Sequence, residues 1–170
     1  MKSYVALLRG VNLGKRQLRM EDLRRIAAEL GLDSPSTYIA SGNLLFRSDQ
    51  SEAGLKRMLE SALARHMSAG VGVMVRTAEE LAAGVKANPF AGEPSNRVVA
   101  IFLDEAAPGD ALDQAKNVAD ERMALGAREI YVHYPGGQGT SKLKIPAAAQ
   151  GTARNMNTVA RLAELAREKS

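Results

Sequence analysis

YVALLRG, residues 4–10, begins the stretch that decides the fold of this 170-residue chain. The run is nearly continuous in apolar character, which predicts a central strand buried on both faces. The segment that follows, residues 20–31, has apolar residues at intervals of three and four and ends in Gly31. This spacing predicts an amphipathic helix that stops at the glycine.

A hairpin, a second helix and a fourth strand continue the pattern. Residues 36–48 (STYIASGNLLFRS) form two short apolar runs around Ser41-Gly42-Asn43, which predicts a hairpin. Asp49 and Glu52 have the spacing of a helix start, and residues 71–76 (VGVMVR) alternate like a half-buried strand. The resulting order, β-α-β-β-α-β, is that of a ferredoxin-like split βαβ unit.

The second half of the chain echoes this order. Thr77 and Glu80 form a capping box that opens a helix, and the Pro- and Gly-containing residues 87–96 are typical of a boundary between lobes. A strand at 97–104, a short helix at 109–119, a hairpin at 121–134 turning at Gly126, an irregular glycine-rich segment at 135–142 and a helix at 157–169 follow. We therefore predict an α+β fold of two ferredoxin-like (split βαβ) lobes packed together. Their limits are a first lobe at 1–76, a helix and linker at 77–96, and a second lobe with the C-terminal helix at 97–170.

Composition narrows the classes of function. The chain has no cysteine, which excludes disulfides, thiolate metal sites and cysteine nucleophiles and fits a cytoplasmic location. No signal peptide or membrane-spanning run is visible, so no membrane partner is expected. The net charge of +4 favours anionic ligands, although it is too small to indicate a nucleic-acid-binding protein by itself.

Five phrases, in order along the chain, carry a resemblance: YVALLRGVNLG, TYIASGNLLF, NPF, YPGGQGTSKL and TARNMNT. Together they resemble an uncharacterised bacterial family, a domain of unknown function with an R-G-[IV]-N-[VL]-G opening motif and a T-x-R-N-W-N-T closing motif. The resemblance runs from Tyr4 to about Leu162. It implies a two-lobed, ferredoxin-like α+β fold, and it implies no activity. Lys15 and Met156 depart from the family pattern, where a glycine and a tryptophan stand.

The opening motif, residues 9–15 (RGVNLGK), resembles a phosphate-binding loop but lacks its essential spacing. A Walker loop needs G-x-x-x-x-G-K-[ST], and here the spacing is one residue short and Arg16 replaces the hydroxyl. The dinucleotide motif G-x-G-x-x-G fails as well. Two interpretations stay open for Arg9 and Asn12: a plain turn, or a loop that faces a ligand.

The closing motif offers a second set of polar residues. Asn155 is a natural N-cap for the last helix, with Arg154 before it and Asn157 in the first turn. A helix N-terminus favours anions, and Lys142 on the glycine-rich segment would add a positive charge. Ordinary capping with solvated cations is the alternative.

Signatures of catalysis and of metal or cofactor binding are missing. His66 and His133 have no partners at metal-ligand spacing, so no metal and no cofactor are expected. Ser41 lacks the G-x-S-x-G context of a nucleophile. Base stacking in the manner of RNA-recognition motifs is disfavoured because Asn43 and Leu45 occupy the positions where aromatic rings would stand. The sequence leaves open whether any reaction is catalysed.

Our leading hypothesis from sequence is a cytoplasmic protein that binds a small anion, such as a nucleotide or a phosphorylated metabolite. The alternative is a non-enzymatic module that contacts nucleic acid or protein through its basic surface. The predicted ligand-binding residues share a place at a strand end, a glycine-rich loop or a helix start, and should meet in one cleft between the lobes: Arg9, Asn12, Lys142, Arg154, Asn155 and Asn157. The competing interpretation is that these residues tie the two lobes together through hydrogen bonds.

Overall fold

The computed structural model describes residues 1–14 and 16–169. Contacts divide the chain into two units: unit 1 is Met1–Leu81 with Leu162–Ser170, and unit 2 is Ala82–Arg161. Both limits of unit 2 therefore fall inside helices, α3 (Ala78–Lys86) and α4 (Met156–Lys169). Residues 87–96 belong to unit 2 in this division.

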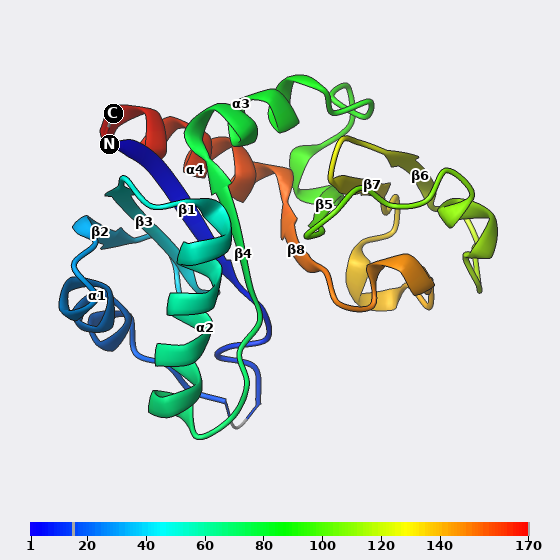
Figure 1. The fold of residues 1–170 in the computed structure, drawn as a ribbon. Helices are drawn as coiled ribbons and strands as arrows, with labels where there is room; N and C mark the ends of the chain where they lie inside the picture. The colour runs from blue at the N-terminus through cyan, green and yellow to red at the C-terminus, as the bar shows by residue number, and fades with distance from the viewer. Residues whose placement is uncertain (15, 170) are drawn as a thin grey trace. The chain divides into compact units, whose positions relative to one another are not determined.

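Unit 1 has the element order predicted from sequence. Its strands and helices are β1 (Lys2–Leu8), α1 (Met20–Glu29), β2 (Asp33–Thr37), β3 (Asn43–Ser48), α2 (Glu52–Met67) and β4 (Val73–Thr77). The strands form a sheet in the order β2-β3-β1-β4 with antiparallel neighbours, as Figure 1 shows. A helix follows both β1 and β3, which is the ferredoxin-like arrangement.

β1 is buried on both faces, as its continuous apolar run predicts. Tyr4, Ala6 and Leu8 belong to the cluster that α1 and α2 complete on one face of the sheet. Val5 and Leu7 point to the other face and are also fully buried. Leu7 pairs with Asn43 of β3 and with Met74 of β4, so β1 is a central strand.

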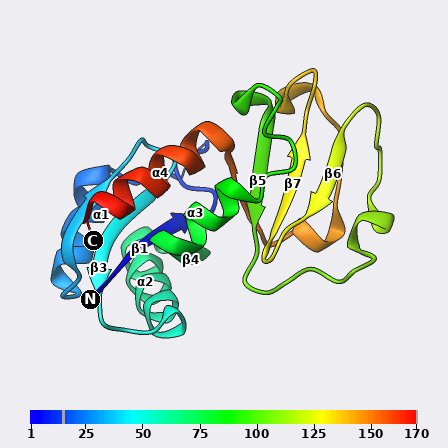
Figure 2. The same ribbon diagram turned by 90° about the horizontal axis from the view of Figure 1, so that it is seen from above.

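Unit 2 repeats the strand order of unit 1. Its strands are β5 (Val98–Phe102), β6 (Arg122–Leu125), β7 (Glu129–His133) and β8 (Thr152–Asn155). They are arranged β6-β7-β5-β8, again with antiparallel neighbours, and β6, β7 and β5 lie side by side in Figure 2. In both units the order is second, third, first and fourth strand. The predicted α+β fold with two ferredoxin-like lobes is confirmed.

Unit 2 differs from unit 1 in its connections. Short 3-10 turns stand where α1 and α2 stand in unit 1: η2 (Ala111–Gln114) between β5 and β6, and η3 (Gln138–Thr140) and η4 (Pro146–Ala148) between β7 and β8. A further 3-10 turn, η1 (Ser95–Arg97), precedes β5. The predicted helix at 109–119 is wrong, because only a single turn forms before Ala115 takes up extended backbone with ψ of 142°.

Two helix starts test the capping predictions. The Thr77–Glu80 capping box is confirmed, since Thr77 N donates to Glu80 Oε1 at 2.9 Å and Glu80 N donates to Thr77 Oγ1 at 3.1 Å. Asp49 is not the cap of α2. Ser51 takes that role, and its hydroxyl accepts from Gly54 N at 3.1 Å.

The sequence does not predict β8, because residues 152–155 (TARN) contain no apolar run. These residues form a strand by pairing with β5. The helix that follows it, α4, has the predicted apolar stripe: Met156, Val159, Leu162, Ala163 and Ala166 are all buried. Among the residues that the structure describes, no helix has both the length and the hydropathy needed to cross a membrane.

Candidate functional site

The candidate site lies in unit 2, around Tyr134. Alternation along β7 places Ile130, Val132 and Tyr134 on one face of the sheet, in a cluster with Val99 and Ile145. Tyr134 is buried, and its backbone N donates to Arg97 O at 2.8 Å. The end of β7 therefore fixes the tyrosine ring at the point where the glycine-rich segment begins.

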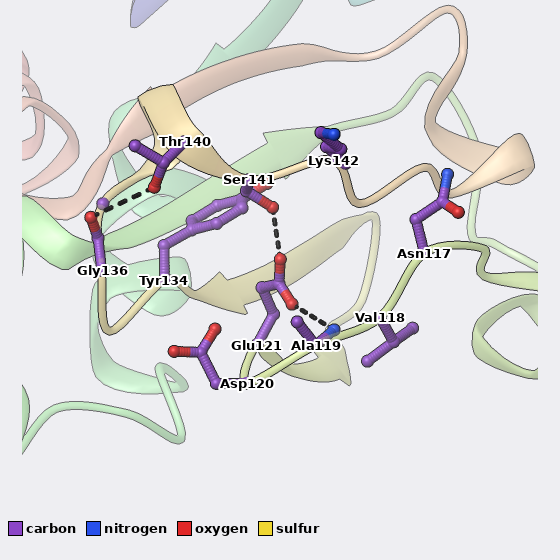
Figure 3. Close-up of a pocket in the computed structure, with 11 residues that line it drawn as sticks. Asn117, Val118, Ala119, Asp120, Glu121, Tyr134, Gly136, Thr140, Ser141 and Lys142 are labelled. Atoms are coloured by element: carbon purple, nitrogen blue, oxygen red, sulfur yellow. Dashed lines mark hydrogen bonds between the residues drawn. The ribbon is translucent and has the colours of Figure 1, made fainter.

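The glycine-rich segment closes a pocket of about 350 Å3 against the loop before β6. We call it the glycine-loop pocket. It is lined by 117–121 on one side and by Tyr134, Gly136, Gly137 and 140–142 on the other, as Figure 3 shows. Gly137 turns the segment with φ of +92°, and its N donates to Tyr134 O at 3.0 Å. The volume suits a small ligand.

Glu121 supplies a buried carboxylate to this pocket. The Ser141 hydroxyl donates to its Oε2, and Ala119 N donates to its Oε1 at 2.7 Å, as the dashed lines in Figure 3 mark. These hydrogen bonds, led by that of Ser141, hold the pKa of Glu121 below its ordinary value. The pocket therefore contains a negative charge at neutral pH.

The Tyr134 hydroxyl remains protonated at neutral pH. Burial raises the pKa of Tyr134, and the negative charge of Glu121 raises it further. The phenol can therefore donate a hydrogen bond to a bound molecule. Within residues 1–14 and 16–169, no group of three or more His, Asp or Glu side chains is placed to hold a metal ion.

A second pocket, of about 420 Å3, shares Tyr134 with the first. We call it the dilysine pocket. Its walls are mostly apolar, and two lysines complete them: Ile101, Tyr134, Leu143, Ile145, Pro146, Ala148, Ala149, Lys116 and Lys144. Lys116 and Lys144 form an isolated antiparallel bridge in which Lys116 N donates to Lys144 O at 2.8 Å and Lys144 N donates to Lys116 O at 2.9 Å.

This bridge sets two positive charges beside each other. Residues that exchange both hydrogen bonds across an antiparallel pair stand directly opposite, with their side chains on the same face and their Cα atoms about 5.5 Å apart. Lys116 and Lys144 are both exposed at the pocket. No carboxylate of the described residues makes an ion pair with either lysine. Lys142 precedes Lys144 by two residues and lines the glycine-loop pocket.

The family of the chain follows from comparison. The model of a family described as "Protein of unknown function (DUF1697)" matches residues 1–131, which is more than half of the chain. The chain belongs to the DUF1697 family. The membership of an uncharacterised bacterial family, predicted from the sequence phrases, is therefore confirmed.

A solved structure supports the same conclusion. Conserved bacterial protein SP0830 from Streptococcus pneumoniae is 27% identical to this DUF1697 protein, with a TM-score of 0.83. The alignment covers 98% of this chain and 99% of that chain. No protein with a curated description matches. Family and neighbour establish the fold, and neither description names an activity.

In unit 1, Asn12 uses its side chain within its own loop. Its Oδ1 accepts from Leu18 N at 2.7 Å, and its Nδ2 donates to Leu18 O at 3.0 Å and to Ala40 O at 2.5 Å. Its backbone takes the left-handed conformation, with φ of 57°. This is the geometry of a turn that holds the loop after β1 to the β2–β3 hairpin. Arg9 is exposed at the end of β1, and its N donates to Gly72 O at 2.8 Å.

In unit 2, the polar residues of the closing motif gather where β8 meets α4. Asn155 caps α4, since its Oδ1 accepts from Thr158 N at 2.9 Å. Asn157 Oδ1 accepts from the Ser95 hydroxyl. Arg154 stands opposite Ala100 on β5, and its Nη1 donates to Ala153 O at 2.9 Å. Burial lowers the pKa of the Arg154 guanidinium to about 10.

Lys142 lines the glycine-loop pocket, whereas Arg154, Asn155 and Asn157 line neither that pocket nor the dilysine pocket. Arg9 and Asn12 belong to unit 1 and the other four predicted residues to unit 2. The single cleft that would join all six stays a prediction.

Sequence reasoning missed Glu121, Tyr134, Lys116 and Lys144 as site residues. One sequence pattern could have indicated the lysines: in residues 141–145 (SKLKI), polar and apolar residues alternate, which is typical of an extended segment with Lys142 and Lys144 on one face. The pairing of Lys144 with Lys116 has no such pattern, because the two segments meet only in the fold.

Proposed function

We propose that this protein binds a small anionic ligand, such as a nucleotide or a phosphorylated metabolite, in the cytoplasm, and that Lys116 and Lys144 hold the anion. The observation that carries the proposal is the directly opposed pair Lys116–Lys144, which has no carboxylate partner among the described residues. Like charges opposite each other in a β pair are destabilising. A bound anion would remove that repulsion.

The chemistry of the lysines supports a phosphate or carboxylate group. An ammonium is a compact point charge with three donors, and its hydrogen bonds to anionic oxygens are roughly twice as strong as neutral ones. Tyr134 forms a wall of both pockets and keeps its hydroxyl proton, so it could add a neutral donor. These groups favour an anion over a neutral ligand.

The Glu121 carboxylate limits where the anion would be held. It lines the glycine-loop pocket and is ionised at neutral pH, so it repels a second negative charge there. It favours instead a hydroxyl or an amine of the ligand. The proposed ligand therefore places its anionic group on the lysines and directs uncharged or donor groups toward Glu121.

A thermal-shift screen of nucleotides, sugar phosphates and organic acids tests the proposal. A ligand present well above its Kd should stabilise the folded protein by a few kcal/mol. Lys144→Ala should weaken its binding at least roughly tenfold. Lys86→Ala, which removes an exposed lysine of α3, is the matched control and should leave binding unchanged.

Three results would count against the proposal. One is a screen without a hit, and another is an equal loss of affinity in both lysine variants. The third is stabilisation by short oligonucleotides alone that disappears as salt is added, since this would support the alternative of a basic surface that contacts nucleic acid.

A further inference from the structure

The dilysine pocket combines two kinds of surface that a simple inorganic anion could not use together. At one side stand the opposed lysines, Lys116 and Lys144. The rest of the wall is formed largely by side chains without charge or hydrogen-bonding groups, among them Ile101, Leu143 and Ile145. A phosphate or sulfate ion held by the ammonium groups would leave these apolar side chains exposed to water.

The apolar wall is fixed by the core beneath it. Ile145 is 8% exposed and belongs to the core cluster of unit 2. Ile101 and Leu143 pack against the same cluster and remain partly exposed toward the pocket. Two backbone hydrogen bonds between Lys116 and Lys144, of 2.8 and 2.9 Å, join the two segments at the edge of the pocket. Cationic edge and apolar wall are thus parts of one pocket surface.

From this arrangement we infer that the dilysine pocket binds an amphipathic organic anion: one carboxylate or phosphate monoester head on Lys116 and Lys144, and an aliphatic or aromatic body on Ile101, Leu143 and Ile145. The inference rests on the proposed function and narrows its ligand class. Burial of the body makes the free energy of binding more favourable, by an amount that increases with the apolar area removed from water. Tyr134 lines this pocket as well as the glycine-loop pocket, and its hydroxyl would add a neutral donor for the head.

Matched pairs of probes separate the contribution of the head from that of the body. Calorimetric titrations compare phenyl phosphate with inorganic phosphate, and octanoate with acetate. The organic anion should bind at least roughly tenfold tighter than the small anion in each pair. Phenol, which keeps the ring and lacks the charged head, should bind more weakly than phenyl phosphate. Comparing the two pairs shows whether phosphate or carboxylate is the preferred head.

Two variants test the two surfaces separately. Lys116→Ala/Lys144→Ala removes both ammonium groups, which stand at exposed positions, and should abolish the preference for phenyl phosphate over phenol. Ala148→Phe places a ring into the pocket wall without burying a polar group, and should reduce binding of phenyl phosphate to the level of inorganic phosphate. If Ala148→Phe fails to fold, judged by circular dichroism, Ile101→Thr provides the second alteration of the apolar wall.

The possible outcomes distinguish this inference from the broader proposal. Equal affinity for phenyl phosphate and inorganic phosphate, with both lost in the double lysine variant, would overturn the inference and leave anion binding intact. Absence of binding by all four anions would overturn the inference, and the broader proposal would fall with it only if the screen of nucleotides and sugar phosphates also gave no hit. Tight binding of phenyl phosphate that survives in the double lysine variant would overturn the assignment of the head to Lys116 and Lys144.

Discussion

Lys116 and Lys144 face each other across a two-residue antiparallel bridge, with reciprocal backbone hydrogen bonds of 2.8 and 2.9 Å. The bridge joins the segment after β5 to the segment after β7, and it stands beside the Tyr134 ring that both pockets share. It fixes the positive edge of the candidate site. Because it sets like charges side by side, it also lowers the stability of the folded protein.

Reversing one charge of this pair should stabilise the folded protein. Lys116→Glu converts a repulsive cross-strand pair into an attractive one, and the free energy of unfolding should rise by about 0.2–1 kcal/mol at low salt. Urea unfolding at low and high salt measures the gain, which screening should reduce. Lys116→Glu/Lys144→Glu restores repulsion and is the matched control. A gain that persists in this double variant would contradict the charge-pair explanation.

Asn12 should prove important for the stability of unit 1. Asn12→Ala removes three side-chain hydrogen bonds, to Leu18 N, Leu18 O and Ala40 O, and should lower the free energy of unfolding by about 1–3 kcal/mol. Asn12→Gly loses the same bonds but tolerates the φ of 57°, so it should be less damaging than alanine. Denaturant unfolding of both variants measures the difference. An unchanged stability together with lost ligand binding would favour the ligand-facing interpretation of this loop.

The sequence predicts most of unit 1 because its elements have a strong local pattern. β1 has a continuous apolar run and α1 an apolar periodicity, and the capping box at Thr77 and Glu80 marks the start of α3. The N-cap role of Asn155 is likewise local, since one side chain bonds a backbone N–H three residues later. Such features depend on residues that are neighbours in the chain.

The parts that sequence reasoning missed depend on residues far apart in the chain. β8 is a strand because Thr152 and Arg154 pair with Phe102 and Ala100, some fifty residues earlier. The predicted helix at 109–119 ends after one turn, where Lys116 is drawn into extended pairing with Lys144. Tertiary pairing overrides local helix preference here, and the same pairing creates the dilysine pocket.

Gly42 should tolerate substitution far less well than Gly31. Both glycines have positive φ, at +91° and +80°, so alanine brings a backbone strain of about 1–2 kcal/mol at either position. At Gly42 the added Cβ would also lie 2.7 Å from Val11 Cγ2 and 2.9 Å from Leu8 Cβ, whereas nothing lies within 4 Å of the Cβ at Gly31. Gly42→Ala should therefore lower the free energy of unfolding by about 1–3 kcal/mol more than Gly31→Ala does. Thermal unfolding of the two variants provides the test, and equal losses would rule out the steric contribution.

Tyr131 should titrate far above an ordinary tyrosine. Burial, followed by the negative charge of Glu129, raises the pKa of Tyr131 to about 12, and its hydroxyl donates to Gly84 O at 2.6 Å. The folded state therefore holds this proton more tightly than the unfolded state, so stability falls as pH rises from about 10 through 12. Ultraviolet titration of phenolate absorbance should contain a step near pH 12 that is absent in Tyr131→Phe. Loss of the hydrogen bond should also cost that variant about 1–2 kcal/mol at neutral pH. A step near pH 12 that remains in Tyr131→Phe would contradict the assignment.

Glu121 should make the protein sensitive to acid. The Ser141 hydroxyl, followed by Ala119 N, lowers the pKa of Glu121 below its ordinary value. A carboxylate whose pKa is lower in the folded state than in the unfolded state stabilises the folded protein at pH values above the unfolded-state pKa. This contribution is lost as pH falls through the folded-state pKa. Ser141→Ala removes the largest cause, so the pKa of Glu121, followed by NMR of its side-chain carboxyl carbon, should move upward. Urea unfolding at successive pH values should then show a smaller loss of stability on acidification in Ser141→Ala, and a smaller loss still in Glu121→Gln, which cannot titrate. Acid profiles of the same steepness in the wild type and Glu121→Gln would show that other carboxylates control the response.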